Sequence, residues 1–247
     1  MIPLPELKTH IGCAGWTVAK EHAHLFPNTG THLERYAQFF NAVEINATFY
    51  RLPKADTVEK WRESVPPEFR FAVKLSREIT HNSRLKDLTN LPLFLERMGL
   101  LQEKLGPVLV QLPPSLSYQE ETAVHFFTEL RKLYEGIVVF EPRHISWFNQ
   151  PVEDMLTGFS ISLVAADPPY SPHGSVPGAW PGLAYFRLHG SPKLYYSEYE
   201  EAYLEELKAK VQALEQQAPV WVIFDNTASG AAVGNAVSLK KRLGADS

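Results

Sequence analysis

The sequence predicts an α/β protein, and more narrowly a (β/α)₈ barrel of the TIM type with eight parallel strands. Eight short apolar runs recur along the chain, about 23 to 38 residues apart, which is roughly the size of a βαβ unit. Helical patterns separate most of these runs. The length of 247 residues is also close to the ~250 residues typical of such barrels.

Each apolar run has the length and composition of a strand. The runs occupy residues 10–16, 42–50, 69–76, 107–115, 136–144, 160–169, 183–190 and 220–227. Several are rich enough in Val and Ile to be buried on both faces, as the strands of a parallel sheet are.

The segments between the runs carry helix start signals. Ser or Thr followed three residues later by Glu forms a capping box, in which side chains and backbone satisfy each other's hydrogen bonds at a helix start. Such boxes occur at Thr31–Glu34, Ser117–Glu120 and Ser197–Glu200, and Asp56–Glu59 is the acidic analogue. We therefore expect helices to begin at these four places.

Two other segments complete the prediction. Apolar residues at helical spacing between Phe94 and Leu105 predict a helix that Gly106 and Pro107 end. Residues 168–182 (PPYSPHGSVPGAWPG) are too rich in Pro and Gly for a helix, so we expect a long loop in place of the sixth helix. A doubly wound open sheet is the alternative architecture, but GCAG after residue 11 does not match its glycine-rich phosphate fingerprint.

Composition limits the classes of function. With 45% hydrophobic residues, residues 1–247 can form a single domain with a large core. The net charge of −4 and the pI near 6.1 disfavour a protein that coats nucleic acid or lies on anionic membranes. A single cysteine, Cys13, excludes an intramolecular disulfide and suits a reducing compartment. The start of the chain, MIPLPELKTH, lacks the pattern of a secretory signal, and no apolar run reaches the ~18 residues of a membrane span, so we expect a cytoplasmic protein.

Polar residues gather at the carboxyl ends of the predicted strands, where barrel enzymes place their sites. They are Glu44 and Asn46, Lys74, Gln111, Glu141 and Arg143, Asp167, Arg187 and His189, and Asp225 with Asn226. Three of these sets are pairs two residues apart, so both members lie on one face of their strand. The pattern predicts a single polar site built from many strands.

Each member of this set also has a plain structural interpretation. Glu141 and Arg143 can form an internal ion pair with a purely structural role. His189 can be a hydrogen-bonded core histidine, His81 a loop or capping residue, and Lys74 the partner of a carboxylate. The aromatic residues that follow strand ends can line a pocket or pack loops against helices. They are Trp16, Tyr50, Trp147, Tyr195 and Tyr196.

Glu44 raises the question of why a carboxylate is tolerated in the apolar run VEINATFY. An unpaired buried carboxylate is costly. We expect Glu44 to face a wet cavity in which nearby cations balance its charge.

Cofactor chemistry has little support in the sequence. No H-x-x-x-H or C-x-x-C spacing occurs. Carboxylates and His189 could still converge on a divalent ion, but Lys74, Arg143 and Arg187 already balance their charge. We predict neither a metal nor another cofactor.

Seven motifs of the chain resemble those of one known family, the YecE-like proteins that contain domain of unknown function 72. They are GCAGW, YAQFFNAVEINATFYRLP, FRFAVKLSREITH, KLGPVLVQLPPS, FEPRHISW, RLHG and FDNTASGAAVGNA, which run in order from Gly12 to about Ala236. The resemblance implies a TIM-type barrel with a polar cavity. By matching position, the hallmark polar residues of the family fall on Glu44, Asn46, Lys74, His81, Gln111, Glu141, Arg143, Trp147, Arg187 and His189.

The chain departs from the family pattern near its end. Asp225-Asn226 stands where the family often has two asparagines, and Ala231-Ala232 replaces an expected histidine or tyrosine. The family has no established reaction to carry over, so the resemblance implies a site without its chemistry.

The leading hypothesis is an enzyme for a small anionic ligand, phosphorylated or carboxylated, with hydrolase or lyase chemistry. Arg presents a fork that suits such anions, and a carboxylate in a partly dry cavity can act as a general acid or base. We expect the catalytic residues to be Glu44, Glu141, His189 and Lys74. We expect the ligand to be bound by Asn46, Tyr50, His81, Gln111, Arg143, Trp147, Asp167, Arg187 and Asn226.

Two alternatives use the same residues. One is binding or cleavage of nucleic-acid phosphodiesters, which the acidic pI disfavours and which rests on fold-level analogy alone. The other is a ligand-binding protein without catalysis. The sequence does not predict a membrane partner or an oligomeric state.

Overall fold

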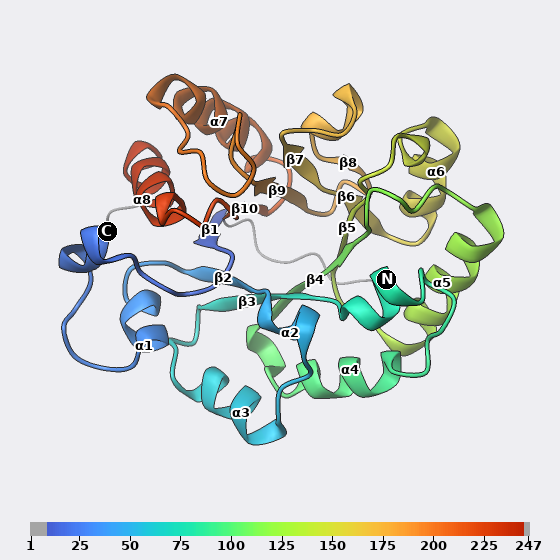
Figure 1. The fold of residues 1–247 in the computed structure, drawn as a ribbon, viewed down its shortest axis with the longest axis horizontal. Helices are drawn as coiled ribbons and strands as arrows, with labels where there is room; N and C mark the ends of the chain where they lie inside the picture. Colours follow the sequence, from blue (N-terminus) through green and yellow to red (C-terminus); the bar gives the residue numbers. More distant parts are fainter. Residues whose placement is uncertain (1–8, 245–247) are drawn as a thin grey trace.

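The computed structural model describes residues 9–244, with strands in the middle of the molecule and the longer helices outside them (Figure 1). The strands are β1 (Thr9–Cys13), β2 (Ala42–Ile45), β3 (Arg70–Lys74), β4 (Leu105–Gln111), β5 (Val138–Glu141), β6 (Ile161–Leu163), β7 (Ala165–Asp167), β8 (Gly178–Ala179), β9 (Ala184–Leu188) and β10 (Val220–Phe224). The α-helices are α1 (His32–Ala37), α2 (Ala47–Tyr50), α3 (Ala55–Glu63), α4 (Leu91–Gly99), α5 (Glu120–Leu133), α6 (Gln150–Gly158), α7 (Glu201–Leu214) and α8 (Ala231–Arg242). Short 3₁₀ helices span Lys20–Leu25, Gln102–Lys104, Ile145–Trp147 and Pro172–Ser175, and a π-helical turn spans Glu78–Asn82.

The strands form two sheets, so the prediction of a clean barrel of eight parallel strands is wrong. One sheet has the order β1-β10-β9-β7 and is parallel throughout. The other has the order β2-β3-β4-β5-β6-β8, and its last pair is antiparallel. The fold is α/β, with one parallel and one mixed sheet.

The first cause of the difference lies in the sixth apolar run, which forms two strands instead of one. The run breaks at Val164, so that β6 pairs with β5 in one sheet while β7 pairs with β9 in the other. The Pro/Gly-rich segment 168–182 then contributes β8, which pairs antiparallel with β6. This segment is described in full, and none of it lies in an α-helix.

The second cause lies between β1 and β2, where side chains take the hydrogen bonds of a ladder. The Tyr36 hydroxyl accepts from the Cys13 backbone N–H at 2.8 Å and donates to the Ala42 carbonyl at 3.0 Å. The Asn41 amide accepts from Ile11 N–H and donates to the Thr9 carbonyl, both at 2.9 Å. These bonds satisfy backbone groups that a strand pair would otherwise satisfy. The ladder pairing between the two segments is therefore limited to one isolated bridge, Ala14 to Glu44.

Gly12 is required at this junction. A Cβ atom at position 12 would stand 2.0 Å from the Ala42 carbonyl oxygen, a separation that no side chain allows.

The alternation of residues along the strands divides the interior into two apolar clusters. The larger cluster packs one face of the strands against the helices. The smaller one, the inner cluster, lies on the opposite face and consists of Ala42, Ala72, Leu109, Val139, Val164, Leu183, Tyr185, Trp221 and Ile223. Because side chains alternate with period two, the residues two positions after inner-cluster members also point to that face.

Helix starts agree with the sequence in one case of four. The Thr31–Glu34 capping box is present, with the Glu34 carboxylate accepting from Thr31 N–H at 2.6 Å. The other three predicted starts are wrong, because the cap residues are Lys54, Gln119 and Glu200 and none donates or accepts a side-chain cap bond. The predicted α4 boundary is also wrong: the helix ends at Gly99, and Leu105 already belongs to β4.

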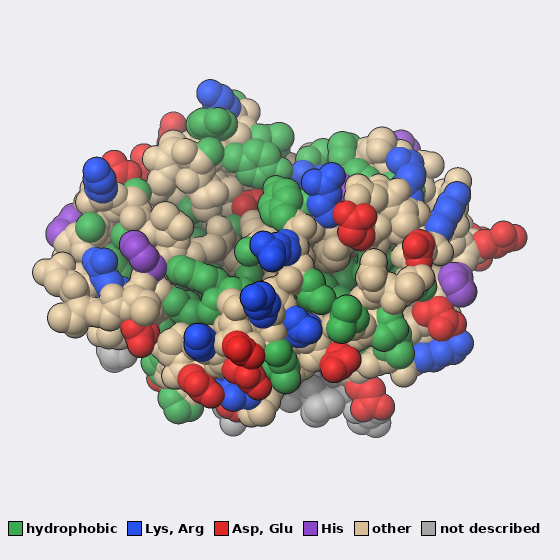
Figure 2. All heavy atoms as spheres, turned by 60° about the horizontal axis from the view of Figure 1, so that its bottom comes forward, with side chains coloured by type: hydrophobic (Ala, Val, Ile, Leu, Met, Phe, Trp, Pro, Cys, Tyr) green, Lys and Arg blue, Asp and Glu red, His purple; other side chains and the backbone are tan. Residues whose placement is uncertain are grey.

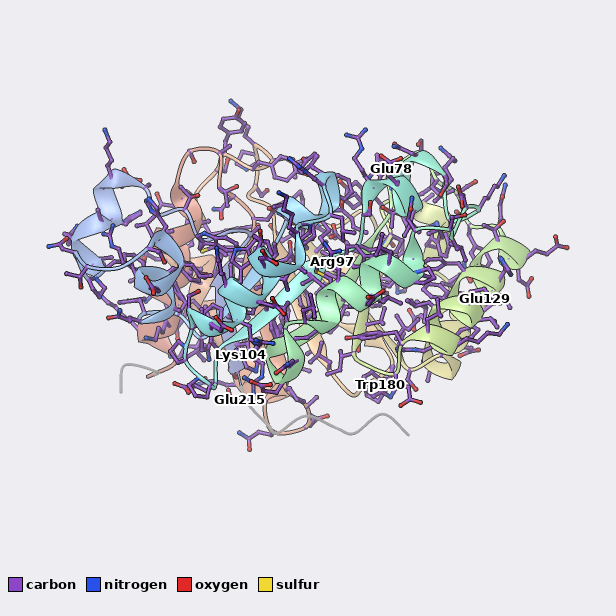
Figure 3. All side chains as sticks on the ribbon, turned by 90° about the horizontal axis from the view of Figure 1, so that it is seen from below. Glu78, Arg97, Lys104, Glu129, Trp180 and Glu215 are labelled. Atoms are coloured by element: carbon purple, nitrogen blue, oxygen red, sulfur yellow. The ribbon has the colours of Figure 1, made fainter. Side chains whose placement is uncertain are left out.

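The two ends of the strands face opposite ends of the molecule. Glu78, which follows β3, lies at one end, whereas Lys104, Trp180 and Glu215, which precede β4, β9 and β10, lie at the other (Figure 3). Within residues 9–244, no helix is long and apolar enough to cross a membrane. Most of the amino-terminal stretch MIPLPELKTH, in which no secretory signal is expected, lies outside the described residues.

Candidate functional site

A polar layer lies directly above the inner apolar cluster. Six strands place a polar residue two positions after an inner-cluster residue, on the same face. The pairs are Ala42/Glu44, Ala72/Lys74, Leu109/Gln111, Val139/Glu141, Tyr185/Arg187 and Ile223/Asp225. The carboxyl ends of six strands thus bring together residues that are far apart in the sequence.

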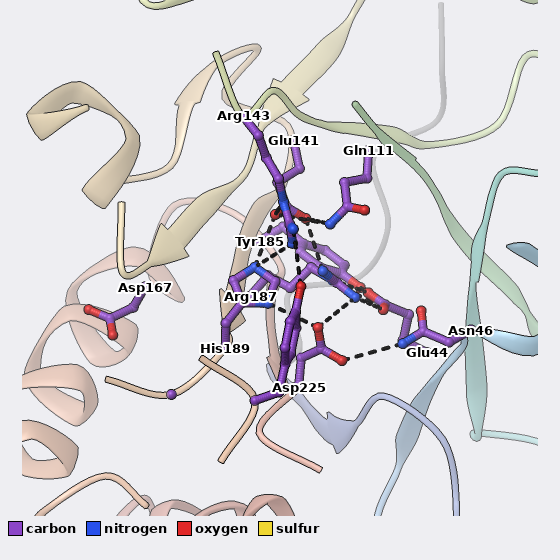
Figure 4. Close-up of polar contacts among 12 residues, drawn as sticks. Glu44, Asn46, Gln111, Glu141, Arg143, Asp167, Tyr185, Arg187, His189 and Asp225 are labelled. Atoms are coloured by element: carbon purple, nitrogen blue, oxygen red, sulfur yellow. Dashed lines mark hydrogen bonds and ion pairs between the residues drawn. The ribbon is translucent and has the colours of Figure 1, made fainter. Parts of the chain in front are cut away.

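Arg187 is the centre of this layer and pairs with three carboxylates (Figure 4). Its Nε lies 3.1 Å from both Glu44 carboxylate oxygens, and its Nη2 donates to Glu44 Oε1 at 2.7 Å. Its Nη1 donates to Glu141 Oε2 at 3.1 Å, and its Nη2 lies 3.1 Å from Asp225 Oδ2. The planar guanidinium supplies five N–H groups in a fixed fork, which suits it to hold several carboxylates at once.

Glu44 is tolerated in the interior because it is paired. Its side chain is 0% exposed, so the expectation of a wet surrounding is wrong for this carboxylate. Arg187 neutralises its charge, and the Tyr185 hydroxyl donates to Oε2 at 2.9 Å. Removing one partner of such a buried pair would leave an uncompensated charge.

His189 lies between two carboxylates. Its Nδ1 is 2.9 Å from Asp225 Oδ2, and its Nε2 is 3.0 Å from Glu141 Oε1. A neutral imidazole has one N–H, whereas the imidazolium form donates to both partners. The ring is fully buried, so its orientation is fixed by these two contacts.

Glu141 connects the buried part of the layer to its outer part. Its carboxylate accepts from Gln111 Nε2 at 3.2 Å and from Arg143 Nε at 3.1 Å, in addition to Arg187 and His189. Burial alone would raise the pKa of Glu141, but Arg143, Arg187 and His189 together hold it well below its usual range. Glu141 is therefore a fixed negative charge.

Arg143 extends toward the surface, with 12% of its side chain exposed. Its Nη1 donates to the Tyr195 hydroxyl at 3.1 Å, and its guanidinium lies 5.6 Å from the centre of the Tyr170 ring. Both tyrosines are half-buried. The Glu141–Arg143 ion pair that the sequence suggested is present, but one side of Arg143 remains directed at these aromatic residues.

Lys74 differs from the other charged groups because its ammonium has no hydrogen bond or ion pair within residues 9–244. Its Nζ lies 4.1 Å from the centre of the Phe49 ring, and the residue is 9% exposed. Burial and the Arg187 charge lower the pKa of Lys74 from its ordinary 10.5 to about 8, although Glu141, Glu44 and Asp225 oppose the shift. Lys74 thus has three N–H donors available and a proton that it can give up near neutral pH.

His81 stands beside Lys74 on the π-helical turn after β3. Its ring contacts the Phe49 ring edge to face, with 4.8 Å between centres, and its Nδ1 is 2.9 Å from the Thr80 hydroxyl. Burial, followed by the charges of Lys74, Arg143 and Arg77, lowers the pKa of His81 from 6.5 to about 4. The ring is therefore neutral at pH 7. Single π-helical turns often occur at functional sites.

Four predicted ligand-binding residues do not join the layer. Trp147 is a core residue whose indole N–H donates to the Leu116 carbonyl at 2.8 Å. Asp167 points away from the cluster and accepts from the Tyr199 hydroxyl at 2.8 Å (Figure 4). Asn226 bonds to Ser197 and Asn235, and Tyr50 is 70% exposed.

Asn46 reaches the edge of the layer, since its amide N–H donates to Asp225 Oδ1 at 3.4 Å. Its own Oδ1 is buried and has no hydrogen-bond partner among the described residues. Asn46 therefore offers one spare acceptor beside the cluster.

The sequence interpretation missed two participants and gave a third no role. Tyr185 lies two residues before Arg187, so the alternation already noted for Arg187 and His189 would have found it. Asp225 was included in the predicted polar set but was given no catalytic or binding role, although it pairs with both Arg187 and His189. Phe49, which covers Lys74, had no distinguishing signal because its run reads as a strand and folds as α2.

Metal ligation has no support from the arrangement of the described residues, which contain no group of three His, Cys, Asp or Glu side chains suited to hold an ion. The strand-end carboxylates that could have bound a metal ion are paired instead with Arg187, Arg143 and His189.

Two hollows lined by described residues lie away from the polar layer. One of about 680 Å³ is lined by residues around Trp180 and Pro219, and another of about 330 Å³ by residues around Asn41 and Glu215. Trp180 and Glu215 lie at the opposite end of the molecule from Glu78 (Figure 3). Neither hollow contains a residue of the polar layer.

Comparison with known proteins identifies the family. The model of the family described as "Protein of unknown function DUF72" matches residues 10–247. The chain belongs to the DUF72 family. The resemblance drawn from the seven motifs is thereby confirmed.

Two relatives of the chain carry the name UPF0759. The UPF0759 protein YecE of Escherichia coli is 37% identical over 126 residues, which are 50% of this chain and 46% of YecE. The UPF0759 protein YunF of Bacillus subtilis is 26% identical over 95% of this chain and 94% of its own length.

Solved DUF72 structures share the fold. A family member from Enterococcus faecalis superposes with a TM-score of 0.80 at 25% identity, covering 96% of this chain and 95% of that one. A member from Thermotoga maritima gives a TM-score of 0.77 at 26% identity, covering 96% and 99%. The α/β architecture with two sheets is thus similar to that of known DUF72 proteins.

Proposed function

We propose that this DUF72 protein binds a small phosphorylated or carboxylated ligand at the outer side of the polar layer, where Lys74, His81 and Arg143 stand. The outer side is the part of the layer with exposed atoms, since Glu44, Arg187 and His189 are buried completely or nearly so.

The observation that carries the proposal is the unpaired ammonium of Lys74. A nearly buried cation without a hydrogen-bond acceptor is costly, and the lowered pKa expresses that cost. An anionic ligand would supply both the charge and the acceptors. Arg143 stands near enough to act on the same neighbour, because the charges of Lys74 and Arg143 both lower the pKa of His81.

The buried part of the layer serves as support in this proposal. Glu44 and Glu141 are held by Arg187, and Glu141 in turn holds Arg143. Because the carboxylates of Glu44 and Glu141 are already paired, they are suited to position cations. Proton transfer would then fall to another group. Lys74, whose pKa of about 8 lies near neutral pH, fits the role of general acid or base in a hydrolase or lyase reaction.

The first test is ligand binding by wild-type protein and by two lysine variants. Inorganic phosphate and malonate are titrated while the melting temperature is recorded, because a ligand that binds the folded state raises it. We expect the Lys74→Met variant to lose the rise and the Lys104→Arg variant to keep it, since Lys104 lies at the opposite end of the molecule (Figure 3). If neither phosphate, malonate nor any phosphorylated or carboxylated metabolite of a panel stabilises the wild type, the proposal fails.

The same titration separates the alternatives. A ligand that binds through Lys74 and is recovered unchanged indicates a binding protein without catalysis. Binding of nucleic acid with a steep salt dependence would favour phosphodiester recognition. On the face shown in Figure 2, several Lys and Arg side chains gather near the middle, with Asp and Glu side chains beside them.

A further inference from the structure

We infer that Lys74 forms a covalent imine with an aldehyde or ketone that also carries a carboxylate or phosphate group. The inference rests on the proposed anion site and narrows its substrate class to carbonyl compounds. It gives Lys74 the role of nucleophile, with Arg143 holding the anionic end of the same molecule.

The surroundings of the Lys74 nitrogen suit a nucleophile. A lysine that donates hydrogen bonds to carboxylates or carbonyls has its nitrogen occupied, whereas Nζ of Lys74 meets the face of Phe49 at 4.1 Å and no acceptor within residues 9–244. Burial and the neighbouring cation Arg187 both disfavour the ammonium form. Desolvation and a neighbouring cation are the two means by which proteins activate a lysine amine.

The supply of free amine follows from these surroundings. With a pKa of about 8, roughly one Lys74 in ten is unprotonated at pH 7, against about one in 3,000 for a lysine of ordinary pKa. The cysteine Cys13 is a poor nucleophile, because it is buried and its pKa is raised to about 12. Lys74 is therefore the group of this site that is best suited to covalent chemistry.

Arg143 is the reason for expecting a carboxylate or phosphate group on the substrate. Its guanidinium is held by Glu141 on one side and directed at Tyr195 and Tyr170 on the other, with part of its side chain exposed. Arg binds carboxylate and phosphate through paired N–H groups. The charges of Lys74 and Arg143 both lower the pKa of His81, so His81 is neutral at pH 7 and adds no third positive charge to the site.

The reaction balances without a further reagent. The Nζ lone pair attacks the carbonyl carbon, the carbonyl oxygen takes up a proton, and a carbinolamine forms. The C–O bond then breaks as the oxygen leaves as water, and the nitrogen forms the C=N bond. Overall, one ammonium group and one carbonyl compound give one protonated imine and one water molecule.

Reductive trapping tests the inference on the intact chain. Wild-type protein is incubated at pH 7 with cyanoborohydride and either pyruvate or dihydroxyacetone phosphate, and the product is mapped by peptide mass spectrometry. We expect one adduct per chain at Lys74, with a mass gain equal to that of the carbonyl compound less one oxygen atom. Labelling of Lys74 should be about 300-fold faster than that of a lysine with the ordinary pKa of 10.5, in line with the larger fraction of free amine.

Matched reagents and variants decide the outcome. Dihydroxyacetone, which lacks the phosphate, should label Lys74 at least tenfold more slowly than dihydroxyacetone phosphate, and Lys74→Arg should abolish the adduct while Lys104→Arg leaves it. Labelling spread over many lysines with no preference for Lys74 overturns the inference, and so does equal labelling by the neutral and the phosphorylated ketone. If phosphate still raises the melting temperature when no adduct forms, the imine inference fails and the anion site stands. If neither effect is seen, both fail.

Discussion

Lys74 and Lys104 are buried to nearly the same degree, yet their ammonium groups have opposite surroundings. Lys74 is 9% exposed and Lys104 7%. Lys104 donates to the backbone carbonyl of Arg62 at 2.6 Å and to that of Val65 at 2.7 Å. Lys74 faces the Phe49 ring and meets no acceptor among the described residues. Burial alone therefore does not distinguish a lysine that stabilises a fold from one that is available for a ligand.

The difference follows from where each lysine sits in the fold. Lys104 lies where the chain enters β4, and its ammonium binds carbonyl groups near the end of α3, whose backbone leaves acceptors unsatisfied. Lys74 is the last residue of β3, on the face that carries the polar layer. Carboxylates in that layer are already engaged by Arg187, Arg143 and His189. The competition for carboxylates leaves Lys74 without one.

Arg187 provides the largest contrast, because it is a buried cation with every neighbour in place. Replacing it by methionine should lower the free energy of unfolding by about 3–5 kcal/mol, since Glu44, Glu141 and Asp225 would lose their common partner. Chemical denaturation measures the effect. Arg187→Lys should recover only part of the loss, because one ammonium cannot hold three carboxylates in the same geometry. A loss below ~1 kcal/mol would show that the layer is well solvated, against the burial on which this comparison depends.

Alternation and strand ends explain how much of this layer the sequence could predict. Glu44, Lys74, Gln111, Glu141, Arg143, Arg187 and His189 were all selected as residues at predicted strand ends, and the structure brings them together. The period of two makes such residues share a face whatever the global fold. Asp167 and Asn226 failed the same rule, since their side chains bond to Tyr199 and to Ser197 and Asn235 instead.

The arrangement of the sheets could not be predicted in the same way. The break at Val164 and the replacement of a ladder by Tyr36 and Asn41 depend on which side chains reach which backbone groups across the fold. A strand pattern states that a segment is extended, but not whether its neighbour is a strand or a side chain. The pairing of Glu44 is a similar case, because the sequence gives no distance between Glu44 and Arg187.

Lys104 tests the structural half of the comparison. Lys104→Met should destabilise the protein by about 2–3 kcal/mol, because the Arg62 and Val65 carbonyls lose a charged donor in a buried position. Thermal or urea denaturation at pH 7 measures the loss. Binding of phosphate at the other end of the molecule should be unaffected. An unchanged stability would mean that water replaces the ammonium at no cost, and Lys104 would cease to be a valid reference for Lys74.

Lys74 should behave in the opposite direction, with an effect that depends on pH. Its pKa in the folded state, about 8, lies below the ordinary 10.5, so the unfolded chain binds more protons between these values. Below pH 8 the ammonium is present in both states and its burial cost is complete. Stability therefore rises with pH from about 8 to 10.5, as the folded state loses its proton first.

Removing the Lys74 charge by substitution should give, at neutral pH, the gain in stability that wild type reaches only at high pH. We expect Lys74→Met to raise the free energy of unfolding by about 1–2 kcal/mol at pH 7, because the cost of the buried ammonium disappears while the contact between cation and Phe49 is lost. At pH 10 the advantage over wild type should have disappeared, because the folded wild type has by then lost the Lys74 proton. Urea denaturation of both proteins at pH 7 and pH 10 gives the difference directly. A Lys74→Met variant less stable than wild type at pH 7 would mean that the ammonium has stabilising partners, and the case for an anion beside it would be lost.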